Sequence, residues 1–262
     1  MYIARTNSTN TLLKELIAQG RWPADERFIR AGYQTSGRGQ AGNGWESEAD
    51  KNLLCSILLP PRKNLFELNV IASVAVHRLV EDLIGANAIK WPNDIYWQDK
   101  KVAGILVENA IIGNEVRYSI AGIGLNVNQT EWHSDAPNPV SLKQIRESCQ
   151  PSAIGRQIPD FDLNELMQRL MEEIDALLHA DGEDLWNYYK AHLYRREGFW
   201  PFVEREVSLA PTMNADRAYS RQHSAVSFMA RISDVLPTGE ILLTDQQNQE
   251  RKYHFKQIRY VL

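Results

Sequence analysis

The amino-acid sequence predicts an α/β protein with two domains, residues 1–200 and residues 201–262. In the first part, segments with apolar residues at helical spacing alternate with short apolar runs typical of strands. After Pro201 the pattern changes to short alternating segments, separated by turn residues such as the Pro-Thr-Gly at 237–239. These observations together predict a small β-barrel that follows an α/β domain.

The first predicted helix begins near Ser8, Thr9 and Asn10, three residue types suited to an N-terminal cap. Apolar residues then recur on one helical face until Gly20 ends the run. A short strand is predicted at residues 28–34.

A glycine-rich, polar segment at residues 35–50 has no periodicity and is predicted to be a long loop. It leads into an apolar strand at 53–59 and then into a helix that ends at Gly85. Residues 101–109 and 115–123 are predicted to pair as a hairpin across the Gly-Asn turn at 113–114.

The last third of the chain is predicted to contain two helices, at 163–180 and 183–193, before the small β domain. The strands expected in that domain are 204–209, 226–235, 240–244 and 253–261.

Composition excludes several classes of protein. The 262 residues are 44% hydrophobic and 24% charged, and they suffice to bury a sizeable core. A net charge of −4 gives no global positive field, so neither DNA nor a membrane is an expected partner. Cys55 and Cys149 fit no metal or redox spacing and are predicted to be reduced core thiols. No signal-type or membrane-spanning apolar run is visible, which favours a cytoplasmic protein.

Residues 37–42 match the pattern GxGxxG, but two familiar interpretations fail. A dinucleotide fingerprint requires its last glycine to open a helix, and the residues that follow cannot start one. A P-loop requires a lysine where Asn43 stands. A loop with unblocked amides, one guanidinium at Arg38 and the aromatic Trp45 remains, and it suits an anionic ligand. The alternative is a solvated surface loop whose Trp45 packs into the core.

A second group of polar residues is suited to nucleotide chemistry. A Lys-Trp-Pro-Asn-Asp block at 90–94 is followed by residues 100–108, which begin with two lysines. An ammonium group and oxygen ligands for Mg²⁺ are what the attack of a carboxylate on a phosphate needs. Gly122, Gly124 and Asn126 then mark a strand end where a ligand can approach the backbone. A hairpin with solvated lysines and an ordinary turn is the alternative.

Taken in order, these motifs resemble those of biotin protein ligases. The matching segments are Ser-Thr-Asn at 8–10, Gln34 with Gly-Arg-Gly at 37–39 and Trp45, Lys-Trp-Pro-Asn-Asp at 90–94, Lys-x-x-Gly-Ile-Leu-Val-Glu at 101–108 and Gly-x-Gly-x-Asn at 122–126. The resemblance covers residues 8–128, and the last sixty residues are more weakly similar to the SH3-like C-terminal domain of that family.

The resemblance implies a class II synthetase-like catalytic domain, with helices flanking a mixed, largely antiparallel sheet, followed by an SH3-like β-barrel. It implies that biotin and ATP, with Mg²⁺, give biotinyl-5′-AMP, and that biotin then passes to a lysine of a biotin carboxyl carrier protein. Which carboxylase is served, and whether the chain is a monomer or a homodimer, stay open.

Carried over by motif, the resemblance gives two catalytic residues, Lys101 and Arg38, with Lys101 between the biotin carboxylate and the α-phosphate of ATP. The Ser-Thr pair and Gln34 would hold the ureido ring, which is costly to bury without hydrogen bonds. The implied biotin-binding residues are Ser8, Thr9, Asn10, Gln34, Gly37, Arg38, Gly39, Lys101, Gly104 and Gly122.

The implied nucleotide site includes an aromatic cover, Trp45, over the adenylate. The nucleotide-binding residues are Trp45, Lys90, Asn93, Asp94, Gly124 and Asn126. Within that set, Asp94 and Asn126 are the implied Mg²⁺ ligands.

The sequence departs from the family at the glycine-rich loop, where Gln40, Ala41 and Asn43 stand at positions that are arginine in many members. We therefore expect a weaker grip on biotinyl-adenylate. In addition, Ser8 follows only seven residues, so no helix-turn-helix domain is expected before it.

Two rival functions stay open at this point. A lipoate ligase or lipoyl transferase shares the fold and a catalytic lysine, but needs an apolar tunnel rather than ureido-binding groups. A non-catalytic biotin or nucleotide sensor would keep the pocket without turnover, and the presence of both Arg38 and Lys101 speaks against it.

Overall fold

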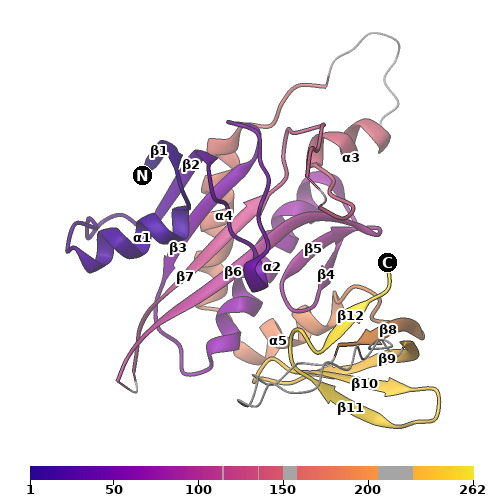
Figure 1. The fold of residues 1–262 in the computed structure, drawn as a ribbon. Coiled ribbons are helices and arrows are strands. Elements are labelled where there is room, and N and C mark those ends of the chain that lie inside the picture. The colour runs from indigo at the N-terminus through magenta and orange to yellow at the C-terminus, as the bar shows by residue number, and fades with distance from the viewer. Residues whose placement is uncertain (114, 135, 150–157, 206–226) are drawn as a thin grey trace, which may run out of the picture. The chain divides into compact units, whose positions relative to one another are not determined.

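The computed structural model describes residues 1–113, 115–134, 136–149, 158–205 and 227–262. The chain divides into two compact units, Met1–Tyr194 and Arg195–Leu262 (Figure 1). Each unit is built around a sheet of its own. The division falls a few residues before position 200, where the sequence-based boundary lies.

The sheet of the first unit has seven strands in the order β1-β2-β3-β7-β6-β5-β4. Their bounds are β1 Tyr2–Thr6, β2 Phe28–Gln34, β3 Leu53–Leu59, β4 Ala88–Lys90, β5 Asp94–Trp97, β6 Lys100–Ile112 and β7 Glu115–Leu125. The β1–β2 pair is parallel and the other pairs are antiparallel, which confirms the predicted mixed sheet. The β6–β7 hairpin turns at Gly113, whose φ of 63° favours glycine, while Asn114 lies outside the described residues.

Five α-helices occupy the described part of the first unit. They are α1 Thr9–Ala18, α2 Leu65–Ile84, α3 Leu142–Cys149, α4 Leu163–Leu178 and α5 Gly182–Ala191. Side chains cap three of them, since Asn64, Asp162 and Asp181 accept hydrogen bonds from the first turns of α2, α4 and α5. The sequence did not predict α3, because the eight-residue helix is mostly polar and buries only two residues, Leu142 and Ile145.

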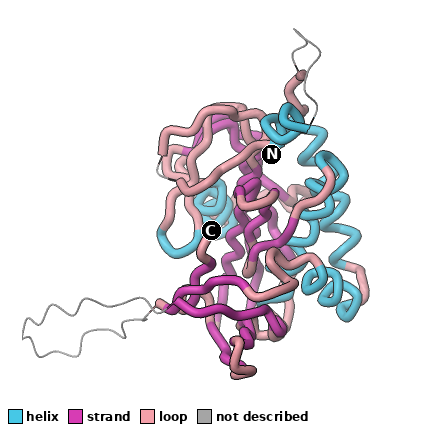
Figure 2. Tube along the Cα trace, turned by 90° about the vertical axis from the view of Figure 1, so that its right-hand side faces the viewer, coloured by secondary structure: helices cyan, strands magenta, loops and turns pink. Residues whose placement is uncertain are grey.

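Helices cover both faces of this sheet. Leu13 of α1 packs with Ile29 of β2 and Ile120 of β7 in one fully buried cluster. Arg30, the neighbour of Ile29, donates instead to Asn164 of α4 at 2.9 Å. Because side chains alternate along a strand, α1 lies on one face and α4 on the other. Helix α2 packs along α4 on that second face, and Figure 2 shows most helices on one side of the strands.

The second unit is a five-stranded antiparallel sheet in the order β11-β10-β9-β8-β12. The bounds are β8 Trp200–Glu204, β9 Ser227–Val235, β10 Ile241–Asp245, β11 Glu250–Tyr253 and β12 Ile258–Tyr260. The strand predicted at 253–261 is wrong, because the chain turns after Tyr253, with a φ of 84° at Lys256, before β12 begins. The strand predicted at 204–209 lies mostly outside the described residues.

The predictions for the two cysteines concern their oxidation state and their burial. The thiols were predicted to be reduced core groups, and neither forms a disulfide. Cys55 is buried, which raises the pKa of its thiol to about 12, but Cys149 is exposed on α3, so its placement in the core was wrong. In the described ranges, no helix is long and apolar enough to cross a membrane.

The packing of α1 on the sheet can be tested at Leu13, whose side chain is fully buried. We expect Leu13→Ala to reduce the free energy of unfolding by about 2–5 kcal/mol, since it removes buried methyl groups and leaves a cavity. Leu12→Ala, at a half-buried position of the same helix, should cost clearly less. Urea unfolding followed by circular dichroism measures both, and equal losses would contradict this packing.

Candidate active site

Three glycines leave an area of bare backbone on the face of the sheet that α1 covers. Gly104 of β6 pairs with Gly124 of β7, and Gly122 lies two residues before Gly124 in the same strand. A Cβ atom at Gly122 would lie 2.4 Å from Oδ1 of Asn10. One at Gly124 would lie 2.4 Å from the ring of Trp45. Side chains are therefore excluded here, and α1 and the Trp45 indole enclose the bare area.

The start of α1 carries polar groups that are buried beside this area. Ser8, Thr9 and Asn10 are 4%, 3% and 3% exposed. Gln34 accepts two hydrogen bonds at its Oε1, from the Thr9 amide at 2.7 Å and the Thr9 hydroxyl at 3.1 Å. Ser8 is the N-cap residue, but its side chain makes no capping hydrogen bond. Buried polar groups are costly unless they are partnered, so this cluster suits a ligand with its own donors and acceptors.

Ser56 joins this cluster, although sequence reasoning did not single it out. It lies in β3, is fully buried, and donates to the Thr9 hydroxyl at 2.7 Å. The available signal was a single serine in the apolar run 53–59.

Glu108 of β6 connects α1 with the glycine-rich loop. Its carboxylate accepts from Nδ2 of Asn10 at 2.7 Å, from Nζ of Lys14 at 2.7 Å and from Nη2 of Arg38 at 2.8 Å. Burial alone would raise the pKa of Glu108, but the hydrogen bonds from Lys14 and Asn10 and the two nearby cations together lower it. The sequence motif includes Glu108, yet sequence reasoning assigned it no role.

Lys101 lies at the other end of the glycine floor. Its Nζ is 2.8 Å from Oδ1 of Asp94 and 5.6 Å from the centre of the Trp45 ring. A Cβ atom at Gly104 would lie 3.0 Å from the same Nζ. The two side chains of the ion pair are 29% and 25% exposed, so both remain accessible to a ligand.

A β-bulge explains why Lys101 lies on this face. The register between β5 and β6 shifts, so that Ile95 faces Ala103 while Tyr96 faces Lys101. Val102 is the extra residue of β6. Regular alternation would put the side chains of Lys101 and Ala103 on the same face, away from α1. The bulge redirects Lys101 toward Gly104 and Asp94.

The glycine-rich loop folds back on itself through backbone hydrogen bonds. The Trp45 amide donates to the Gly37 carbonyl at 2.9 Å, and the Gly39 amide donates to the Asn43 carbonyl at 2.7 Å. A Cβ atom at Gly37 would lie 2.6 Å from the Trp45 carbonyl oxygen. The indole Nε1 of Trp45 is buried and has no partner within the described part of the chain. The loop is thus an ordered turn that places Trp45 on the glycine floor.

Two predicted nucleotide residues hydrogen bond to the backbone through their side-chain amides. Nδ2 of Asn93, which is 1% exposed, donates to the Ile105 carbonyl at 2.9 Å and to Oδ1 of Asn69 in α2 at 3.2 Å. Nδ2 of Asn126 is 3.2 Å from the carbonyls of Lys101 and Val140. Asn93 therefore fixes the turn before Asp94, and Asn126 fixes the start of β6.

Lys90, at the end of β4, pairs in register with Asp94. Its ammonium lies 5.0 Å from the centre of the Tyr96 ring.

Mg²⁺ prefers oxygen ligands and keeps several waters. Asp94 offers a partly exposed carboxylate, and Oδ1 of Asn126 is a buried acceptor that no described donor reaches. These two oxygens are of the type that suits Mg²⁺.

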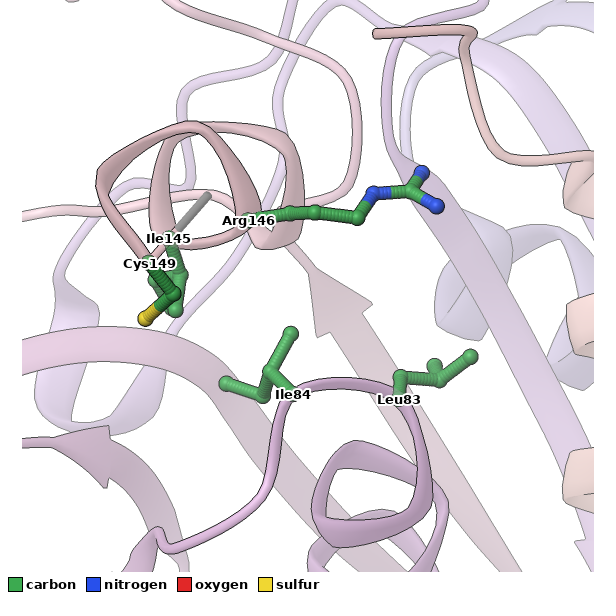
Figure 3. A pocket seen from close by; sticks show the side chains of 5 residues that line it. All are labelled: Leu83, Ile84, Ile145, Arg146 and Cys149. Carbon is green, nitrogen blue, oxygen red and sulfur yellow. The ribbon is translucent and has the colours of Figure 1, made fainter. Parts of the chain in front are cut away.

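A hollow elsewhere in the first unit is distinct from this group of residues. It lies between the end of α2 and α3 and is lined by Leu83, Ile84, Ile145, Arg146 and Cys149 (Figure 3). None of the predicted site residues lines it.

The first unit is thus an α/β domain with one candidate site on the face of the sheet that α1 covers. Residues 2–126 match the model of the biotin/lipoate A/B protein ligase family. The chain is thus similar to this family over residues 2–126.

The chain is similar to named members of the family. It is 39% identical over 132 residues to the bifunctional ligase/repressor BirA of Bacillus subtilis, an alignment that covers 48% of this chain and 39% of that protein. It is 32% identical over 182 residues to the biotin–[acetyl-CoA-carboxylase] ligase of Mycobacterium tuberculosis, covering 66% of this chain and 62% of that protein. The chain thus spans about two fifths of the length of the Bacillus relatives that it matches.

Solved structures share the fold. The biotin protein ligase from Aquifex aeolicus in complex with biotin and ATP has a TM-score of 0.72 and 21% identity, covering 100% of this chain and 98% of that chain. The ligase from Leishmania major in complex with biotinyl-5-AMP has a TM-score of 0.60 and 18% identity, covering 97% of each chain.

The role of Glu108 can be tested by its pH dependence. We expect Glu108→Gln to lower the free energy of unfolding by roughly 1–3 kcal/mol at pH 7, because bonds to a charged acceptor are lost. Since the pKa of Glu108 is lowered in the folded state, this stabilisation is present above the unfolded value of 4.5. It is lost as the pH falls through the lower folded pKa.

Urea unfolding at a series of pH values measures this difference. Glu115→Gln, at an exposed position of β7, is the matched control and should differ little from wild type at any pH. A Glu108→Gln deficit that stays constant down to pH 3 would argue against the ionic role.

Proposed function

We propose that the chain is an ATP-dependent biotin protein ligase, which forms biotinyl-5′-AMP and transfers biotin to a lysine of a biotin carboxyl carrier protein. The observation that carries the proposal is the position of Lys101, which lies over the bare floor at Gly104 and pairs with Asp94. The family match and the fold shared with ligases crystallised with biotin and ATP support it. The first unit would carry the chemistry, and the cytoplasm is the compartment that we propose.

Biotin combines a polar ureido ring with an apolar ring system and a short acid chain. The buried hydroxyls and amide at Ser8, Thr9 and Gln34 would hydrogen bond to the ureido group. The bare backbone at Gly104 and Gly122 would form the floor of the biotin site once the Trp45 and Asn10 side chains that lie against it make way. A lipoyl ring has no ureido group, so it would leave this polar cluster without its ligand partner, which favours biotin over lipoate.

In the first step, a biotin carboxylate oxygen forms a bond to the α-phosphorus of ATP while the bond from that phosphorus to the β-phosphate bridge breaks and pyrophosphate leaves. Two anions must approach each other, so cations are needed between them. Lys101 would lie between the carboxylate and the α-phosphate, and Arg38 would act from the loop. When bound, Mg²⁺ would neutralise the leaving pyrophosphate, with Asp94 and Asn126 as the residues that would hold it.

In the second step, the amine of the carrier lysine attacks the acyl carbon of biotinyl-5′-AMP, and AMP leaves. The mixed anhydride has to be kept from water until the carrier arrives. Trp45 on its ordered loop would cover the adenylate, since its indole already lies against Gly104 and Gly124. The lysine loses one proton, which leaves with solvent.

The direct test combines the full chain with ATP, Mg²⁺, biotin and an apo-carrier domain, and weighs the carrier by mass spectrometry. We expect the carrier to gain one biotinyl group, and to gain nothing when lipoate replaces biotin. A carrier that gains lipoate instead would assign the chain to the other branch of the family. A carrier that gains neither group would refute the proposal.

The role of Lys101 can be separated from general charge effects. We expect Lys101→Ala to lower the rate of biotin-dependent pyrophosphate release by about 10²–10³-fold, because transition-state charge stabilisation is lost. Lys100→Ala removes the neighbouring exposed lysine and should leave the rate within about twofold. Equal rates for Lys101→Ala and wild type would overturn the assignment of Lys101.

The small number of arginines in the glycine-rich loop should determine how fast biotinyl-5′-AMP is released. We expect Asn43→Arg to slow the release of preformed biotinyl-5′-AMP by about tenfold or more, since one charge-assisted hydrogen bond is worth about 1.5–3 kcal/mol. Asn43 contributes only its backbone to the described contacts of the loop, so the substitution preserves the fold. Filter-trap dissociation measures the rate, with Asn43→Gln as the neutral control. Identical rates for the two variants would contradict this expectation.

A further inference from the structure

Three side chains with metal-binding atoms meet in the helical layer of the first unit. His77 and Glu81 lie one turn apart on α2, and His192 directly follows α5. One donor atom from each residue lies within 4.8 Å of the others. These residues are on helices that cover the face of the sheet opposite to α1, so they lie apart from Lys101 and the glycine floor.

Backbone carbonyls fix which nitrogen of each histidine carries the hydrogen. Nε2 of His77 is 3.3 Å from the Asn87 carbonyl oxygen, and Nδ1 of His192 is 2.8 Å from the Tyr188 carbonyl oxygen. A carbonyl only accepts, so both of these nitrogens donate. The remaining nitrogens, Nδ1 of His77 and Nε2 of His192, are then the ones that can accept or bind a metal. Metal-binding histidines are oriented in this way.

The Tyr188 hydroxyl lies between two members of the cluster. The Tyr188 hydroxyl is 3.1 Å from Nδ1 of His77 and 3.3 Å from Oε2 of Glu81, and its single hydrogen serves only one of them. Arg78, one residue after His77, lies over the Tyr188 ring at 4.6 Å and pairs with Glu173 at 3.8 Å. Burial, followed by the nearby His192, lowers the pKa of His77 to about 4, so its ring is neutral at pH 7.

We propose that His77, Glu81 and His192 form a binding site for one transition-metal ion of the Zn²⁺ type. Two imidazole nitrogens and a carboxylate make a three-ligand set that Zn²⁺ accepts with a water in the fourth position. Ligands at about 2.0–2.1 Å from Zn²⁺ lie roughly 3.4 Å apart. The donors therefore need to close in, and the exposed Glu81 is free to rotate.

The chemistry of the ligands separates this site from that of the proposed reaction. Imidazole nitrogens favour Zn²⁺, Co²⁺ and Ni²⁺, whereas Mg²⁺ prefers oxygen ligands alone. An ion held here would link the second half of α2 to the end of α5. It would thereby tie together two helices that are held by side-chain packing.

The experiment is calorimetric titration of the full chain with ZnCl₂ in the absence of nucleotide. We expect one ion to bind per chain, and His192→Ala to weaken that binding by at least tenfold. The matched control is His179→Ala. His179 follows α4 as His192 follows α5, with its Nδ1 2.8 Å from the carbonyl oxygen of Asp175 four residues earlier. That control should bind Zn²⁺ as the wild type does.

Two further measurements make the outcome decisive. Glu81→Gln changes an exposed side chain, so it should weaken Zn²⁺ binding without affecting the fold, and circular dichroism verifies that each variant is folded. Co²⁺ in place of Zn²⁺ should show the visible absorption of a tetrahedral site, and millimolar Mg²⁺ should not remove it. Absence of a stoichiometric Zn²⁺ site in the wild type, or equal affinities in His192→Ala and His179→Ala, would overturn the proposal.

Discussion

The site depends on one steric constraint, the absence of side chains at Gly104, Gly122 and Gly124. Each added Cβ atom would lie within 2.9 Å of Asn10 or Trp45. A residue larger than glycine at any of these three positions would therefore clash with the start of α1 or with the indole. Glycine weakens a strand, because it loses more backbone entropy on folding than other residues do and has no side chain to pack. Here β6 and β7 are central strands bonded on both sides, which offsets that weakness.

Both cations of the site form ion pairs with carboxylates on the same face of the sheet. Lys101 pairs with Asp94 and Arg38 pairs with Glu108, each at 2.8 Å. Because the four side chains are 22% to 43% exposed, such pairs contribute little to stability. An anionic ligand can therefore bind to either cation with little loss of folding stability. The carboxylates thus hold the two cations in position while leaving them accessible to a ligand.

The sequence predicted strands 28–34 and 53–59 with their observed bounds, because apolar runs end there at turn residues. It also predicted the motif residues that meet at the floor. It could not predict the face on which Lys101 lies, since a bulge reverses the alternation. Glu108 contacts Lys14 and Arg38, which lie 94 and 70 residues away in the sequence. No local sequence pattern predicts such tertiary contacts. Strand β1 was missed because it is a short edge strand in which no residue is buried.

Helices α2 and α5 contact the turn at residues 91–93, which directly precedes Asp94 of the Lys101–Asp94 ion pair. Asn69 of α2 accepts from the side chain of Asn93, and the Tyr189 hydroxyl of α5 donates to the Pro92 carbonyl at 2.7 Å. The next residue is Asp94, the partner of Lys101. The position of the Lys101 ammonium thus depends on how α2 and α5 pack against each other. An ion bound where these two helices meet would act on that packing from the opposite face of the sheet, without touching the glycine floor.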